Sequence, residues 1–267
     1  MLRSSNPILS KRDAFTPAAP QYGQNPYQDP YGSGPGSTPT RTSDDRMTFD
    51  DVVTKTAVTM GVLVLAAAAA WNLIPDRLYL PAMILSGLVG FVAVLIVSFR
   101  RVVSPPLVLF YAAVEGIFIG MISKVFEGYY PGIVAQAVVA TFFAAGATLA
   151  AYKFFNIRVT AKFTKVVIIS TVAFAALMLV NFVFSLATGS TGLRGGIVGP
   201  VSPLAIGISL IAIVLAVFNL ILDFDYIEKG VQMGAPANES WRGAFGLTVT
   251  MVWLYIEMLR LISYIRR

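Results

Sequence analysis

The chain of 267 residues is 56% hydrophobic and only 13% charged, with a net charge of +6. A soluble domain is usually about 25% charged, so this composition excludes an ordinary soluble protein and indicates a polytopic membrane protein. The chain also has no histidine and no cysteine, which excludes zinc or haem ligation by these residues and Ser-His or Cys-His catalysis, so we expect neither an enzyme nor a bound cofactor.

The first part of the chain differs in composition from the rest. Residues 1–47 are rich in Pro, Gly, Tyr, Gln and Ser and contain few aliphatic residues, which predicts a disordered tail. The tail lacks the apolar core of a secretory signal, so we expect it to stay in the cytoplasm. The ordered domain is expected to span residues 48–267. It begins at Thr48, which with Asp51 has the spacing of a helix capping box.

Seven apolar segments follow, each long enough to approach or reach the length of a membrane-spanning helix. They cover residues 57–74, 78–99, 107–122, 131–152, 166–187, 203–222 and 244–265. Lys and Arg are more numerous at the ends that share a side with the N-terminus, which predicts a cytoplasmic N-terminus. The sequence therefore predicts an all-α, seven-helix protein integral to the plasma (inner) membrane, with its basic charge in loops and no role in binding nucleic acid.

Three acidic residues interrupt or end these apolar segments. They are Glu115 in the third segment, Asp223 at the end of the sixth, and Glu257 in the seventh. An ionised side chain at the bilayer centre costs roughly 2.5–3.5 kcal/mol on the insertion scale. Stability gives no reason to accept this cost, so we interpret the three acids as functional.

The seventh segment carries a polar stripe. Trp253, Glu257, Arg260 and Tyr264 follow one another at helical spacing, which places them on one face. Polar groups within a bilayer face the bundle interior or water, so we expect this helix to be central. Arg260 can neutralise Glu257 or extend toward the interface.

The other two acids also have polar or small neighbours on their own helices. Asn219 lies four residues before Asp223 and shares its helix face, whereas Asp225 points elsewhere and is expected at the membrane boundary. In the third segment Gly116 and Gly120 form a pair that allows close helix approach. Glu115, in the same segment, either lines a pore or donates a hydrogen bond as a neutral acid.

Two short patches resemble the Bax inhibitor-1 family, also called the transmembrane Bax-inhibitor-motif or YccA/YetJ-like family. They read LDFDYI at residues 222–227 and LYIEMLRLI at residues 254–262. The seven-helix layout, the Leu80-Pro81 start of the second helix and its Arg100-Arg101 end are similar as well. The resemblance covers residues 48–267 and is to the bacterial members in particular.

The resemblance implies a bundle in which six helices surround the last one, with a paired-acid site between the sixth and last helices. Carried over by position, the pair is Asp223 and Glu257. It would sense pH and transiently bind calcium in a calcium leak, with Arg100 or Arg101 as the latch. The chain departs from the family pattern in its Asp–Glu pair, in a longer linker between the two acids, and in Ser86 where some relatives have Glu. Glu115 is a hypothetical replacement for that missing carboxylate.

The predicted function is therefore a proton-modulated calcium leak through the bundle, with the bilayer, calcium and protons as its partners. Two alternatives remain open. One is a non-conducting regulator that binds a membrane protease or another membrane protein, and the other is a proton-coupled transporter of a small solute.

Overall fold

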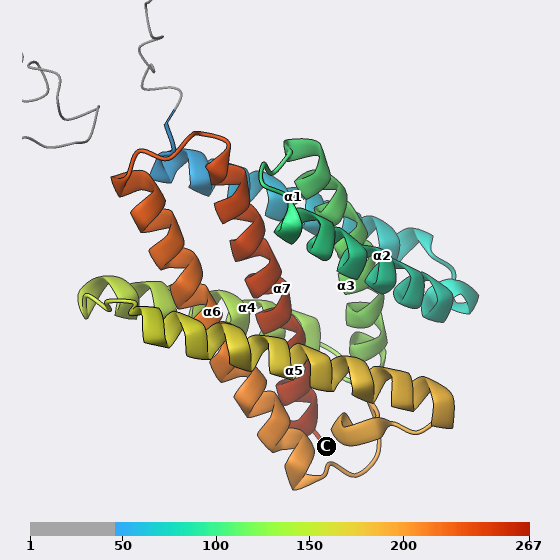
Figure 1. The fold of residues 1–267 in the computed structure, drawn as a ribbon. Helices are drawn as coiled ribbons and strands as arrows, with labels where there is room; N and C mark the ends of the chain where they lie inside the picture. The colour runs from blue at the N-terminus through green and yellow to red at the C-terminus, as the bar shows by residue number, and fades with distance from the viewer. Residues whose placement is uncertain (1–45) are drawn as a thin grey trace, which may run out of the picture. The chain divides into compact units, whose positions relative to one another are not determined.

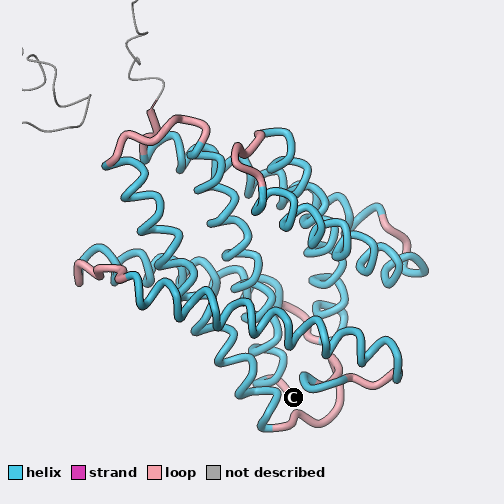
Figure 2. Tube along the Cα trace, in the orientation of Figure 1, coloured by secondary structure: helices cyan, strands magenta, loops and turns pink. Residues whose placement is uncertain are grey.

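A computed structural model describes residues 46–267, so the predicted tail lies outside the described residues except for Arg46 and Met47. Figures 1 and 2 show long helices joined by loops. The helices are α1 (Phe49–Leu73), α2 (Tyr79–Phe99), α3 (Pro105–Tyr129), α4 (Ile133–Phe154), α5 (Ala161–Thr188), α6 (Pro203–Gln232) and α7 (Glu239–Ile265), with 3₁₀ turns η2 (Asp76–Leu78) and η3 (Gly192–Arg194) between them.

These seven helices are long and apolar enough to cross a membrane, and residues 46–267 contain no β-strand. The predicted all-α, seven-helix membrane fold is confirmed. Local signals fix several helix ends. The Thr48 hydroxyl accepts a hydrogen bond from the Asp51 amide at 3.2 Å, as the capping spacing predicted, and Thr160 and Ser202 cap α5 and α6 in the same way.

Several helices extend beyond the apolar runs that predicted them. α1 and α7 begin earlier, at Phe49 and Glu239, and α3 and α6 end later, at Tyr129 and Gln232. An apolar run marks the part of a helix suited to hydrocarbon, whereas backbone hydrogen bonding continues into the polar interface. Side-chain pairs support these ends: Lys229 donates to Asp225 one turn earlier in α6, at 2.7 Å.

The last helix lies inside the bundle, as predicted (Figure 1). It packs directly against α1, α3, α4 and α6. Its Trp253 ring stacks on Phe174 of α5 with the ring centroids 5.8 Å apart. Its Phe245 ring meets Tyr111 of α3 edge-on and belongs to a cluster that includes Val97 of α2. α7 therefore packs directly against four helices and reaches α5 through the Trp253 ring.

The glycine pair of α3 brings this helix against α1. A Cβ added at Gly116 would overlap the carbonyl oxygen of Leu63, and one added at Gly120 would overlap that of Ala67. The predicted close approach at these glycines is confirmed.

The loops meet at two ends of the bundle. At one end the Met47 amide donates to the Ala235 carbonyl at 2.7 Å, which joins the start of the described chain to the α6–α7 loop. At the other end the Tyr130 hydroxyl donates to the Ile197 carbonyl at 3.0 Å, which joins the α3–α4 and α5–α6 loops. The loops therefore alternate between the two ends, as expected for helices that cross a membrane one after another. Which end faces the cytoplasm stays a prediction.

Candidate functional site around α7

Glu257 forms a buried ion pair with a loop arginine. The residue is only 2% exposed, and its Oε1 accepts a hydrogen bond from Arg194 Nη1 at 2.7 Å. Arg194 belongs to η3, in the loop between α5 and α6. This loop therefore reaches into the bundle and neutralises the α7 carboxylate.

The pair is bonded through a single hydrogen bond. Glu257 Oε2 and Arg194 Nε and Nη2 are buried without a hydrogen-bond partner within residues 46–267. Removing two charges from water costs several kcal/mol per ion, and attraction offsets this cost only when the remaining polar atoms are also satisfied. Burial lowers the pKa of Arg194, while the adjacent Glu257 carboxylate acts to raise it. The contact is therefore specific but incompletely satisfied.

The polar stripe predicted on α7 surrounds this arginine. The Tyr264 hydroxyl donates to the Arg194 carbonyl at 2.7 Å. The Arg194 guanidinium lies 5.3 Å from the ring centroid of Phe174, the ring that stacks on Trp253. Trp253, Glu257 and Tyr264 therefore share one face of α7, and this face meets η3 and α5.

Neighbouring backbone and side-chain contacts hold η3 in place. The Leu193 amide donates to Asn181 Oδ1 of α5 at 2.7 Å. Gly192 has a φ of +64°, and a Cβ there would overlap Asn181 Oδ1 and crowd the Ser185 hydroxyl. Glycine is thus required both by the backbone conformation and by the space available.

Asp223 lies on the face of α6 that meets α7. Its Oδ2 accepts a hydrogen bond from the Thr250 hydroxyl at 2.6 Å. One turn earlier on α7, Gly246 makes room for the carboxylate, since a Cβ there would lie 2.9 Å from Asp223 Oδ1. No basic side chain pairs with Asp223 in the part of the chain that the structure describes.

The structure does not bring Asp223 and Glu257 into hydrogen-bond contact. Asp223 bonds Thr250, whereas Glu257 lies seven residues further along α7 and bonds Arg194. Seven residues correspond to about 10 Å of helix rise. In this conformation the two carboxylates share α7 but not a proton.

Glu115 points from α3 toward α2. A Cβ added at Gly90 of α2 would lie 2.6 Å from Glu115 Oε2. α3 runs alongside α7 in the same direction, because Tyr111 packs on Phe245 and Ser123 bonds Tyr255 further along both helices. Glu115 is one turn beyond Tyr111, so it lies about one turn beyond Phe245 along α7.

That depth is also the depth of Asp223, which contacts α7 at Gly246 and Thr250. Glu115 and Asp223 therefore lie at a similar level of the membrane-spanning region, on the α3 and α6 sides of α7. Neither forms an ion pair among residues 46–267.

The predicted latch arginines lie apart from the acids. Arg100 Nη1 donates to the Ser104 hydroxyl at 3.5 Å, and the carbonyls of Arg100 and Arg101 accept from Arg242. Neither arginine forms an ion pair with Asp223 or Glu257 in the described chain. In this structure the basic partner of Glu257 is Arg194, from the loop between α5 and α6.

The two supporting polar residues also have other partners. Asn219 Nδ2 donates to the Thr171 hydroxyl of α5 at 2.7 Å. Arg260 does not pair with Glu257. It lines a small cavity with Gly195 and Ile197, and its Nε is buried without a partner in the described chain.

Calcium was predicted to bind transiently at Asp223 and Glu257. Among residues 46–267, no group of three or more Asp, Glu, His or Cys side chains is placed to hold a metal ion together. Asp223 instead contacts Thr250 of α7, Glu257 lies seven residues further along α7, and Glu115 faces Gly90 of α2. The role of Asp223, Glu257 and Glu115 with calcium stays a prediction.

Sequence comparison gives the family. No curated protein sequence matches this chain at a significant level. The family model described as Bax inhibitor 1 like matches residues 6–267, which is nearly the whole chain. The chain therefore belongs to the Bax inhibitor 1 like family of multi-pass membrane proteins.

Proposed function

We propose that this protein provides a proton-modulated leak pathway for calcium along α7. The observation that carries the proposal is the presence of three carboxylates inside the helix bundle, two of them on or against α7 and the third, Glu115, on the neighbouring α3. Glu115 and Asp223 flank it at a similar level, and Glu257 lies beyond them toward the α5–α6 loop. Acidic groups within a membrane mark ion or proton pathways, and calcium prefers oxygen ligands.

In this proposal Arg194 closes the pathway. Its cationic group neutralises Glu257 and would repel calcium near that carboxylate. The contact replaces the latch role that resemblance suggested for Arg100 or Arg101. Because several polar atoms of the pair have no partner, displacement of η3 would release Arg194 and leave Glu257 free to attract a cation.

Protons act on the two carboxylates that have no basic partner. Glu115 and Asp223 attract calcium when they are ionised and lose that attraction when they are protonated. Conduction is therefore expected to fall as the solution becomes more acidic. This assignment places proton modulation at the level of Glu115 and Asp223, separate from the Arg194–Glu257 contact.

The test is calcium uptake into proteoliposomes that contain the purified protein. Uptake is expected to fall strongly in Asp223→Asn/Glu257→Gln and in Glu115→Gln/Asp223→Asn. The second variant leaves the Arg194–Glu257 pair intact. A fall in uptake in this variant therefore cannot come from unfolding caused by a broken ion pair. Asp225→Asn is the matched control, since Asp225 is an acid of the same helix that pairs with Lys229. Unchanged uptake in both double variants would refute the proposal.

A further inference from the structure

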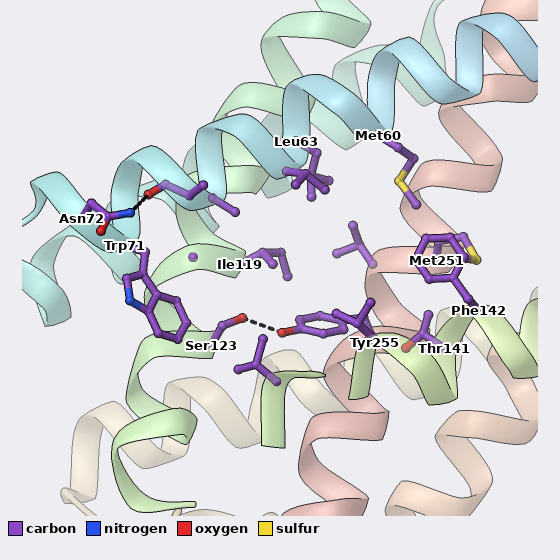
Figure 3. A pocket seen from close by; sticks show the side chains of 17 residues that line it. Met60, Leu63, Trp71, Asn72, Ile119, Ser123, Thr141, Phe142, Met251 and Tyr255 are labelled. Carbon is purple, nitrogen blue, oxygen red and sulfur yellow. Dashed lines mark hydrogen bonds between the residues drawn. The ribbon is translucent and has the colours of Figure 1, made fainter. Parts of the chain in front are cut away.

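A second feature of the fold is an apolar cavity of about 490 Å³ between α1, α3, α4 and α7 (Figure 3). Its size lies within the range of small-molecule sites. Leu63, Ile119 and Val252 are among its apolar lining residues, and the Trp71 ring lies at one end (Figure 3). No Asp, Glu, Lys or Arg lines it, so it is distinct from the carboxylates described above.

Four polar side chains of the cavity wall already have partners inside the protein. Ser123 Oγ and Tyr255 Oη lie 2.7 Å apart and share a hydrogen bond, drawn as a dashed line in Figure 3. Asn72 donates to the Ala68 carbonyl and Thr141 to the Ala137 carbonyl, each one turn earlier on its own helix. The wall therefore offers little to a polar or charged ligand and favours hydrocarbon.

The cavity lies between two helices that do not pack against each other. α1 and α4 both line it, yet none of their Cα atoms approach within 8 Å of each other. Val64 of α1 and Phe142 of α4 line the cavity and are each 61% exposed. Both helices are membrane-spanning segments, so an opening between them faces lipid tails.

We propose that this cavity binds one acyl chain of a bilayer phospholipid, which enters between α1 and α4. The chain supplies the apolar atoms that the wall lacks, and the bilayer supplies the chain at high local concentration. Ser123 and Tyr255 have one hydroxyl hydrogen each, and the hydrogen bond between them uses only one of the two. The other remains available to an acceptor such as the ester carbonyl of the lipid.

The occupant is tested by tryptophan quenching. Trp241→Phe/Trp253→Phe leaves Trp71 as the single tryptophan of the chain. The full-length protein in detergent micelles is titrated with phosphatidylcholine that carries bromine on one acyl chain. Saturable quenching of Trp71 at about one lipid per protein is expected.

Cavity-filling variants in the same background identify the site. Ala68→Phe adds a ring at a lining position, whereas Ala69→Phe adds the same ring at a neighbouring residue that does not line the cavity. Exclusion of two methylene groups weakens binding about tenfold, so at least this loss is expected for Ala68→Phe and little change for Ala69→Phe. Val138→Phe fills the opposite wall, on α4, and is expected to act like Ala68→Phe.

Quenching that rises without saturation would overturn the proposal, because lipid that exchanges at the protein surface behaves in this way. It is also overturned if Ala68→Phe and Val138→Phe bind the brominated lipid as tightly as Ala69→Phe does. Circular dichroism selects the variants that retain the helical fold. The readout is lipid binding alone, so its outcome is independent of calcium conduction.

Discussion

Arg194 and Glu257 form a buried ion pair that joins the α5–α6 loop to the central helix, with 2.7 Å between Arg194 Nη1 and Glu257 Oε1. The two residues are 63 positions apart in the sequence. The pair explains how an acid can sit inside an apolar bundle, since the loop supplies the counter-charge. It also makes the loop the element whose movement would change the charge around α7.

Removal of either charge should destabilise the protein. Arg194→Gln and Glu257→Gln each leave an uncompensated buried charge, which typically costs about 3–5 kcal/mol. The Arg194→Gln/Glu257→Gln double variant removes both charges and should recover most of the loss. Thermal unfolding in detergent measures this cycle. If the double variant instead loses as much stability as the two single variants added together, the two residues do not interact directly.

Gly192→Ala should loosen η3 and with it the ion pair. The substitution forces a side chain into a left-handed backbone conformation, at roughly 1–2 kcal/mol, and also overlaps Asn181 Oδ1. Gly189→Ala is the matched control, because Gly189 is also left-handed, with a φ of +66°, but has open space around its Cβ position. A larger loss of thermal stability is expected for Gly192→Ala. Equal losses would show that crowding against Asn181 is unimportant.

Thr250→Val should affect Asp223 specifically. The variant keeps the shape of the side chain but removes the hydroxyl that bonds Asp223, and loss of such a partner costs about 1–3 kcal/mol. Thr248→Val is the control, since the Thr248 hydroxyl bonds the Ala244 carbonyl of its own helix. We expect the larger drop in unfolding temperature for Thr250→Val, and the reverse order would argue against the Asp223 contact.

The α1–α3 contact should depend on Gly120. Gly120→Ala inserts a methyl group against the Ala67 carbonyl, and overpacking typically costs about 1–3 kcal/mol. Gly128→Ala, on the same helix with open space around it, should be neutral or stabilising by up to about 1 kcal/mol. Urea or thermal unfolding distinguishes the two, and a harmless Gly120→Ala would mean that the helices separate readily.

Most of the fold could be predicted from the sequence because a bilayer imposes long apolar segments. The central position of α7 followed from its polar stripe, and the close approach at Gly116 and Gly120 followed from their spacing. The helix ends were less accurate, since helices such as α6 continue past the last apolar residue as far as Gln232.

The partners of the acids could not be predicted in the same way. Arg194 appears in the sequence as one basic residue in a glycine-containing loop, and nothing in its neighbours shows that the loop folds back toward Glu257. Thr250 likewise resembles any hydroxyl residue of a membrane helix. Asp223 and Glu257 were identified as residues of interest from charge alone, but their distance depends on the register between α6 and α7, which a long linker leaves open.

The leak is expected to depend on pH through Glu115 and Asp223. Calcium uptake should rise as the pH increases, because these carboxylates attract calcium only when ionised. In Glu115→Gln/Asp223→Asn, uptake should be low and should change little with pH. A wild-type pH response that survives in this variant would assign proton modulation to other residues.

The most direct measurement is the rate of calcium entry into proteoliposomes with Arg194→Gln. The account predicts a rate several-fold above wild type, because the cation that closes the pathway is gone, and a return to or below the wild-type rate in Arg194→Gln/Glu257→Gln. Arg242→Gln serves as the control, since Arg242 pairs with Glu239 at the other end of α7. An Arg194→Gln rate no higher than wild type, or a rise of equal size in Arg242→Gln, would contradict the account.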